Sequence, residues 1–111
     1  MKTITVPKSI FAEGLLDQDK CPLDQLEEYH LSQTQFNKLW SIGLFEEMNQ
    51  ICGTLIDDYE SESISKMESI IKVIAFIESR KWSEDVNGSI AEIENLFNKA
   101  REYNTSVHFY F

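Results

Sequence analysis

The chain is 111 residues long, the length of one ordinary globular domain, so we expect a single domain spanning residues 1–111. Apolar residues make up 42% of the sequence and charged residues 26%, a balance that excludes intrinsic disorder. Nineteen acidic against ten basic residues give a net charge of −9, which argues against direct binding of nucleic acid.

The N-terminal third carries signals for two short elements. In residues 2–6, Ile4 and Val6 alternate with Thr3 and Thr5, and Pro7 ends the pattern. This period of two predicts a short strand. Residues 9–20 fit either a loop or a single turn of helix. Pro22 is suited to the first position of a helix, so we predict a short helix from there through about His30.

A long central helix is predicted next. Ser32 and Gln35 have the spacing of a capping box, and Gly53 is suited to end the helix that they begin. Gly43 inside this stretch costs about 1 kcal/mol relative to Ala, which indicates that another element packs closely there. The apolar stripe at helical spacing consists of Phe36, Trp40, Leu44, Met48, Ile51 and Leu55.

Two further helices follow. The first is predicted over about residues 62–81, with a core face of Met67, Ile70, Ile71, Ile74 and Ile77. Asn87 and Gly88 then indicate a turn, and Ser89 with Glu92 forms a capping box for the next helix. Its apolar stripe consists of Ile90, Ile93, Leu96, Phe97, Ala100 and Tyr103.

The chain ends on a predicted strand. Asn104 is suited to a left-handed helix C-cap, and residues 107–111 alternate after it. Because a lone strand exposes unpaired backbone groups, we expect the first and last strands to pair. The expected fold class is α+β and mainly helical, with about four helices packed on a small sheet that pairs the N- and C-terminal strands. One strand edge on each side then stays open to a partner strand or to a homo-oligomer.

The N-terminal residues, the longest apolar run and the two cysteines indicate where the chain is located. The N-terminal residues carry no export signal, and the longest apolar run, residues 73–77, is far shorter than the roughly 20 residues that span a bilayer. Cys21 and Cys52 lack the spacing of a zinc site or a disulfide framework. We therefore expect a cytoplasmic chain with no membrane contact, no cofactor and no metal.

No constellation of residues predicts catalysis. Glu27 and His30 have the spacing of one half of a di-iron site, but such sites need a second pair and two further glutamates. His30 is better explained as a cation near a helix C-terminus. A thiol–histidine pair could use Cys52 or Cys21, yet an apolar setting or nearby acids raise a thiol pKa. We predict no catalytic residues and expect that the chain is not an enzyme.

The negative charge is regional. Residues 1–65 hold four basic and twelve acidic residues, whereas residues 66–111 hold six and seven. Segment 57–62 is strongly acidic and has an aromatic residue in its middle, which is typical of a binding hot spot for a basic partner. Acidic residues before a helix are equally explained by the helix dipole. The predicted partner-binding residues are Asp57, Asp58, Tyr59, Glu60, Glu62, Glu46 and Glu47.

The whole chain resembles a known class of binding proteins. Its size, its acidity, its lack of catalytic motifs and the terminal run 104–111, a final strand after a capped helix, resemble the cytoplasmic immunity proteins of bacterial toxin systems, including contact-dependent growth inhibition. The resemblance is one of type and carries no individual residues over. It implies a cognate protein toxin, commonly a nuclease with a basic cleft, which the chain neutralises by binding.

Three alternatives remain open. A nucleic-acid mimic that inhibits a host DNA- or RNA-binding protein would carry regularly spaced exposed carboxylates. A small helical enzyme would join His30 or His108 to a carboxylate of shifted pKa in a pocket. A helical scaffold or regulatory subunit would present a large apolar patch instead of an acidic one.

Overall fold

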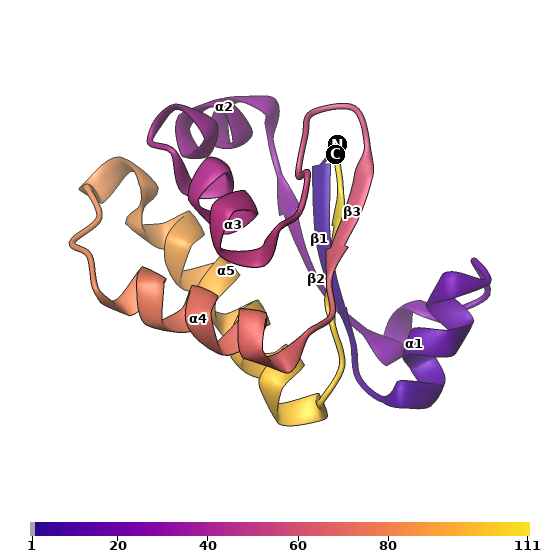
Figure 1. Ribbon diagram of the computed structural model, residues 1–111. Helices are drawn as coiled ribbons and strands as arrows, with labels where there is room; N and C mark the ends of the chain where they lie inside the picture. The colour runs from indigo at the N-terminus through magenta and orange to yellow at the C-terminus, as the bar shows by residue number, and fades with distance from the viewer. Residues whose placement is uncertain (1) are drawn as a thin grey trace.

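Four strands form one antiparallel sheet in the order β2-β1-β4-β3 in the computed structural model, which describes residues 2–111. The strands are β1 (Lys2–Pro7), β2 (Leu26–Leu31), β3 (Ser61–Ile64) and β4 (Val107–Tyr110). The helices are α1 (Ile10–Asp17), α2 (Gln33–Ser41), α3 (Leu44–Cys52), α4 (Met67–Glu78) and α5 (Glu84–Tyr103), with one 3₁₀ turn, η1 (Leu23–Gln25). Helices α2 to α5 lie on one side of the sheet and α1 on the other (Figure 1).

The two ends of the chain meet in the middle of the sheet, as predicted. Strand β1 pairs antiparallel with β4, with Ile4 opposite Phe109, and the two strands lie side by side (Figure 1). The α+β, mainly helical fold class is therefore confirmed. The expectation that β1 and β4 would keep open edges was wrong, because β2 and β3 pair with their outer sides.

The core lies between the sheet and the helical layer. Ile4, Val6 and Phe109 point from the sheet into this layer and are fully buried. At one end of the core, Phe45 and Phe111 pack edge to face with ring centroids 5.2 Å apart. Burial of apolar surface of this kind is the dominant favourable contribution to folding. No described helix has both the length and the apolar character needed to cross a membrane.

Residues 22–31 differ from the prediction. The helix expected from Pro22 to about His30 is only the turn η1, and strand β2 follows it. All six residues of β2 find partners on β1, and this long-range pairing outweighs the weak local preference for a short helix. Upstream, Ser9 caps α1 by accepting a hydrogen bond from the Ala12 backbone N–H, where a loop or a single turn was expected.

The long central helix is divided in two. The capping box of Ser32 and Gln35 is present, and Gly53 ends α3 in the left-handed conformation, as predicted. The single helix was wrong, because Gly43 has φ = 83° between α2 and α3. Nothing lies within 4 Å of a Cβ built on Gly43, so this glycine serves the turn and not a close helix contact.

The last two helices have different bounds from those expected. Strand β3 takes residues 61–64, and α4 begins only at Met67. Ile71, placed on the core face by its spacing, is 47% exposed, whereas Val73 is fully buried. Helix α5 runs straight through Asn87 and Gly88, because burial of Val86 holds its first turn in place. The predicted stripe of α5 and the left-handed C-cap at Asn104 are confirmed.

Replacement of Gly43 and of Gly88 by alanine is expected to change the stability in opposite directions, although a Cβ meets no neighbouring atom at either position. Gly43→Ala places a side chain at positive φ and is expected to lower the free energy of unfolding by about 1–2 kcal/mol. Gly88→Ala lies inside α5 and is expected to raise it by about 0.5–1 kcal/mol. Urea denaturation of both variants checks the two signs, and a shift of the same sign in both would contradict this explanation.

Candidate partner-binding site

The acidic segment forms a hairpin that stands on the end of α3. We call residues 54–62 the acidic hairpin. The Asn49 side chain in the last turn of α3 holds residues 54–56, the first arm of the hairpin. Its Oδ1 accepts from the Ile56 backbone N–H (2.7 Å) and from the Thr54 hydroxyl (2.9 Å), and its Nδ2 donates to the Ile56 carbonyl (3.1 Å). Ile56 is buried in the core. The base of the hairpin is therefore fixed.

The tip of the hairpin is a tight turn. Asp57 and Glu60 form a β-bridge with each other, which leaves Asp58 and Tyr59 as the two turn residues. Tyr59 is 88% exposed, and Glu60 and Asp57 are also exposed. Tyr59 therefore lies exposed among carboxylates. It does not fold back onto the core, which was the alternative explanation of this residue.

Asp58 has an internal partner. It forms an ion pair with Lys2 of β1, which is almost buried, and the Lys2 ammonium lies 4.5 Å from the centroid of the Phe36 ring. The ammonium also donates to the Asp58 backbone carbonyl (3.3 Å). Lys2 and the negative face of the aromatic ring thus bind this end of the hairpin to the sheet and to α2.

Glu62 is also engaged within the chain. Its two carboxylate oxygens accept hydrogen bonds from the backbone N–H groups of Leu55 and Ser63, each at 2.9 Å. Asp58 and Glu62 therefore stabilise the hairpin, whereas Asp57 and Glu60 are exposed to solvent, although Asp57 Oδ1 also accepts a hydrogen bond from the Asp58 backbone N–H. All four lie in one hairpin, as the sequence segment requires.

Glu46 and Glu47 lie elsewhere, in the first turn of α3. Glu47 pairs with Arg80, just beyond the end of α4, at 3.4 Å, and Glu46 is exposed. Within the described residues, no ion pair or hydrogen bond joins either glutamate to the acidic hairpin. Their position at a helix N-terminus has a sufficient explanation in the helix dipole.

A groove separates the hairpin from α2. Phe36, Asn37 and Trp40 form its helical side, and Asp57 and Asp58 form the other side, around a volume of about 400 Å³. Aromatic rings beside carboxylates are the surroundings that favour a lysine or arginine side chain. Lys2 of the chain itself is held by Phe36 and Asp58 in this way.

Leu55 is a site residue that the sequence analysis missed. It was placed on the buried stripe, yet it is 73% exposed in the first arm of the hairpin. The stripe ends at Gly53, where the left-handed C-cap turns the chain away from the helix axis. The position of Leu55 after a predicted helix end was the signal that could have indicated its exposure.

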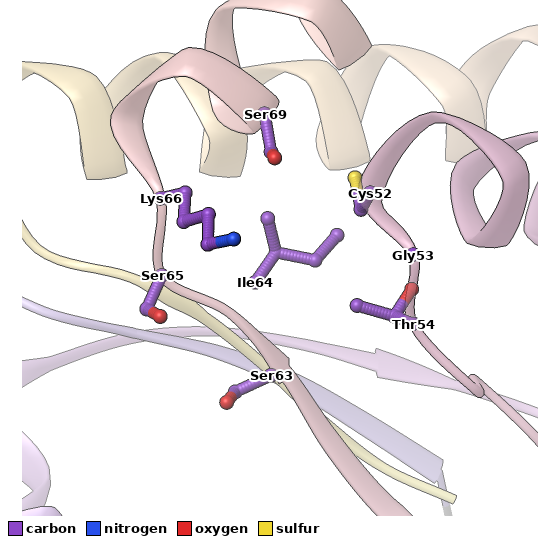
Figure 2. Close-up of a pocket in the computed structure, with 8 residues that line it drawn as sticks. All are labelled: Cys52, Gly53, Thr54, Ser63, Ile64, Ser65, Lys66 and Ser69. Carbon is purple, nitrogen blue, oxygen red and sulfur yellow. The ribbon is translucent and has the colours of Figure 1, made fainter.

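A second hollow lies between the end of α3, β3 and the start of α4 (Figure 2), with a volume of about 200 Å³. In Figure 2 the side chains of Cys52 and Ser69 face the hollow, and Lys66 extends across Ile64. Burial raises the pKa of the Cys52 thiol, and this outweighs the opposite effects of Ser69 and Lys72. The thiol is therefore neutral near pH 7 and a weak nucleophile.

The histidines and the other cysteine have structural settings. Glu27 and His30 belong to a strand, so they point to opposite faces of the sheet and cannot share a metal. Glu27 accepts a hydrogen bond from the Tyr103 hydroxyl (2.8 Å), and the His30 Nδ1 bonds the Thr3 hydroxyl (3.0 Å), so its expected role at a helix end was wrong. Partial burial, with Asp24 nearby, raises the pKa of Cys21.

His108 belongs to a polar cluster under α1. The Ser106 hydroxyl, 1% exposed, donates to the Glu13 carboxylate and lies 2.7 Å from the His108 Nε2. A hydroxyl has one proton to give, so Nε2 carries the hydrogen and donates to Ser106. The cluster attaches α1 to the sheet, and its serine is closed to a substrate.

The comparisons with known proteins give no relative: no protein-family model, no curated protein and no solved structure matches this chain.

The setting of His108 predicts a specific pH dependence of stability. Burial lowers the pKa of His108 below 6.5, although Asp17 and Glu13 act in the opposite direction. The unfolded chain therefore takes up the proton first, and stability is lost as the pH falls through about 6.5. We expect the urea midpoint to fall between pH 7.5 and 5.5, and to fall less in His108→Gln. Equal slopes for wild type and His108→Gln would refute this prediction.

Proposed function

We propose that this chain is an immunity-type inhibitor that acts in the cytoplasm and neutralises a basic protein toxin, a nuclease domain, by binding it through the acidic hairpin. The observation that carries the proposal is the tip of the hairpin, where an almost fully exposed Tyr59 stands between two outward-facing carboxylates, Asp57 and Glu60. Exposed tyrosines with charged neighbours are enriched at the energetic centres of protein interfaces. The proposed function is binding alone and involves no catalytic step by this chain.

The fixed base of the hairpin supports a binding role. Asn49, Lys2 and the Glu62 carboxylate each hold one part of it, so the tip needs little ordering when a partner arrives. A preformed surface loses less conformational entropy on binding than a mobile loop does. Leu55 adds a second exposed apolar side chain on the same hairpin.

The charge of the region suits a nuclease. A nuclease cleft must present lysine and arginine side chains to phosphates, and carboxylates of a folded protein can take the positions of those phosphates. No basic residue occurs between Lys38 and Lys66, and the cation that pairs with the hairpin, Lys2, engages Asp58. Complementary charge raises association rates toward about 10⁸–10⁹ M⁻¹s⁻¹ at low salt.

The groove beside α2 supplies a place for one cationic side chain of the partner. Lys2 occupies the position over Phe36, while Trp40 and Asp57 border the rest of the groove. An arginine that enters there would stack on the indole ring and pair with the carboxylate. Burial of such a residue would lengthen the lifetime of the complex.

The alternatives find less support. A nucleic-acid mimic needs a row of free carboxylates, but Asp58, Glu62 and Glu47 are engaged by groups of the chain itself. An enzyme that uses His108 needs an accessible nucleophile, and the adjacent Ser106 is buried and bonded to Glu13.

Inhibition of a purified partner tests the proposal. The protein encoded next to this chain is purified, and its cleavage of RNA and DNA is measured with and without an equimolar amount of the chain. We expect nuclease activity alone and loss of that activity on mixing. Absence of both binding and inhibition would overturn the proposal.

Charge reversal at the tip tests electrostatic steering. Asp57→Lys/Glu60→Lys is expected to slow association with the basic partner by about tenfold or more at low salt, because steering depends on these two charges. Stopped-flow mixing measures the rate. Glu78→Lys/Glu92→Lys, on exposed surfaces of α4 and α5, makes the same change in net charge and is the control. Equal rates for the two variants would show that net charge alone governs capture.

Truncation of the aromatic side chain tests the lifetime of the complex. Tyr59→Ala is expected to raise the dissociation rate by about tenfold or more, with little change in association, because an interface anchor acts after encounter. The fold should stay intact, since Tyr59 makes no buried contact. Surface plasmon resonance separates the two rates, and Tyr110→Ala, another exposed tyrosine, is the matched control. An unchanged dissociation rate in Tyr59→Ala would remove this residue from the interface.

A further inference from the structure

One edge of the sheet is open along its whole length. Strand β2 pairs with β1 over six consecutive residues, and within the described residues no strand lies on its other side. Natural proteins protect such edges with charged side chains, lysine above all, with proline or with a β-bulge. The register of β2 is regular, and its sequence, Leu-Glu-Glu-Tyr-His-Leu, contains neither lysine nor proline. Its acidic side chains are Glu27, which accepts a hydrogen bond from Tyr103 on the helical side, and Glu28.

The direction of the free backbone groups follows from one hydrogen bond. The Lys8 N–H donates to the Gln25 carbonyl at 3.0 Å, directly before the paired segment. Hydrogen-bonded and non-bonded pairs alternate in an antiparallel ladder, so Glu27, Tyr29 and Leu31 direct their backbone groups to β1. The N–H and C=O groups of Leu26, Glu28 and His30 therefore point outward.

This geometry permits few registers for a second copy of the chain. A residue whose backbone groups point outward must pair with another such residue. Within β2, Glu28 can therefore lie opposite Leu26, Glu28 or His30 of an antiparallel copy. Glu28 opposite Glu28 places like charges together, which destabilises a cross-strand pair. Glu28 opposite His30 places an acid beside a base twice, once on each side of a two-fold axis at Tyr29.

We propose that β2 is a dimerisation edge, at which two copies of this chain pair antiparallel about Tyr29 with Glu28 of each copy opposite His30 of the other. Both side chains are exposed on the sheet face that bears α1. The Thr3 hydroxyl engages Nδ1 of His30 at 3.0 Å and leaves Nε2 for the glutamate of the second copy. Each of the two pairs exchanges both backbone hydrogen bonds.

The helical side of the edge is compatible with this arrangement. Tyr29 is anchored by a hydrogen bond from its hydroxyl to Ser89 of α5 (3.1 Å), and Ser89 and the neighbouring Gly88 are small. Nothing outside the backbone of α5 lies within 4 Å of a Cβ built on Gly88. The charge of −9 on each copy opposes association, but at about 0.15 M salt it acts over only about 8 Å.

Sedimentation of the full chain tests the proposal. Over about 5–500 µM at about 0.15 M salt, the range of a weak specific interface, we expect the average mass to rise from 12.9 kDa toward twice that value. Glu28→Pro removes only an outward N–H and is expected to stay at the monomer mass. Ser61→Pro, the matched change on β3, is expected to dimerise like the wild type, because Ser61 lies on the opposite edge of the sheet.

A charge exchange tests the register without changing the backbone. His30→Glu alone places two carboxylates opposite one another, and Glu28→Lys alone removes the carboxylate that accepts from His30, so each is expected to weaken the dimer by about tenfold. The double variant restores unlike pairs and is expected to regain most of the affinity. A monomeric wild type over the whole concentration range, loss of the dimer in Ser61→Pro but not in Glu28→Pro, or no recovery in the double variant would overturn the proposal.

Discussion

The pairing of β1 with β4 is the contact on which the rest of the structure depends. It joins residues near the two ends of the chain, and it gives β2 and β3 the strand partners that neither has locally. Ile4, Val6 and Phe109 then form the floor on which the helices pack. A two-stranded sheet is marginal by itself, so the helical layer and the added strands stabilise this central pair in return.

The same strand determines which acidic residues of the hairpin are paired within the chain. Lys2, the first described residue of β1, neutralises Asp58 and draws the acidic hairpin toward Phe36. The negative charge of segment 57–62 therefore divides into two parts. Asp58 and Glu62 hold the hairpin in shape, and Asp57 and Glu60 face outward from a fixed base. An acidic run in a sequence does not reveal this division, because it depends on contacts made in three dimensions.

Most of the features predicted correctly from the sequence are local ones; the exception is the pairing of β1 with β4, which was expected because a lone strand exposes unpaired backbone groups. The alternation of β1 and β4, the capping box at Ser32 and the left-handed C-caps at Gly53 and Asn104 depend on neighbouring residues. Strand β2 could not be predicted in this way, because its six residues become a strand only when β1 lies beside them. The Lys2–Asp58 ion pair spans 56 positions and the exposure of Leu55 follows a change of chain direction, so neither leaves a periodic signal.

The sheet order keeps the two proposed surfaces apart. In the order β2-β1-β4-β3, the dimerisation edge and the acidic hairpin belong to opposite edges, separated by the two central strands. A two-fold axis at Tyr29 therefore places the two hairpins at the far ends of one continuous eight-stranded sheet, which follows from doubling the four strands of each copy. The two proposals therefore involve different residues, and under both of them each copy in the dimer would hold its own toxin molecule.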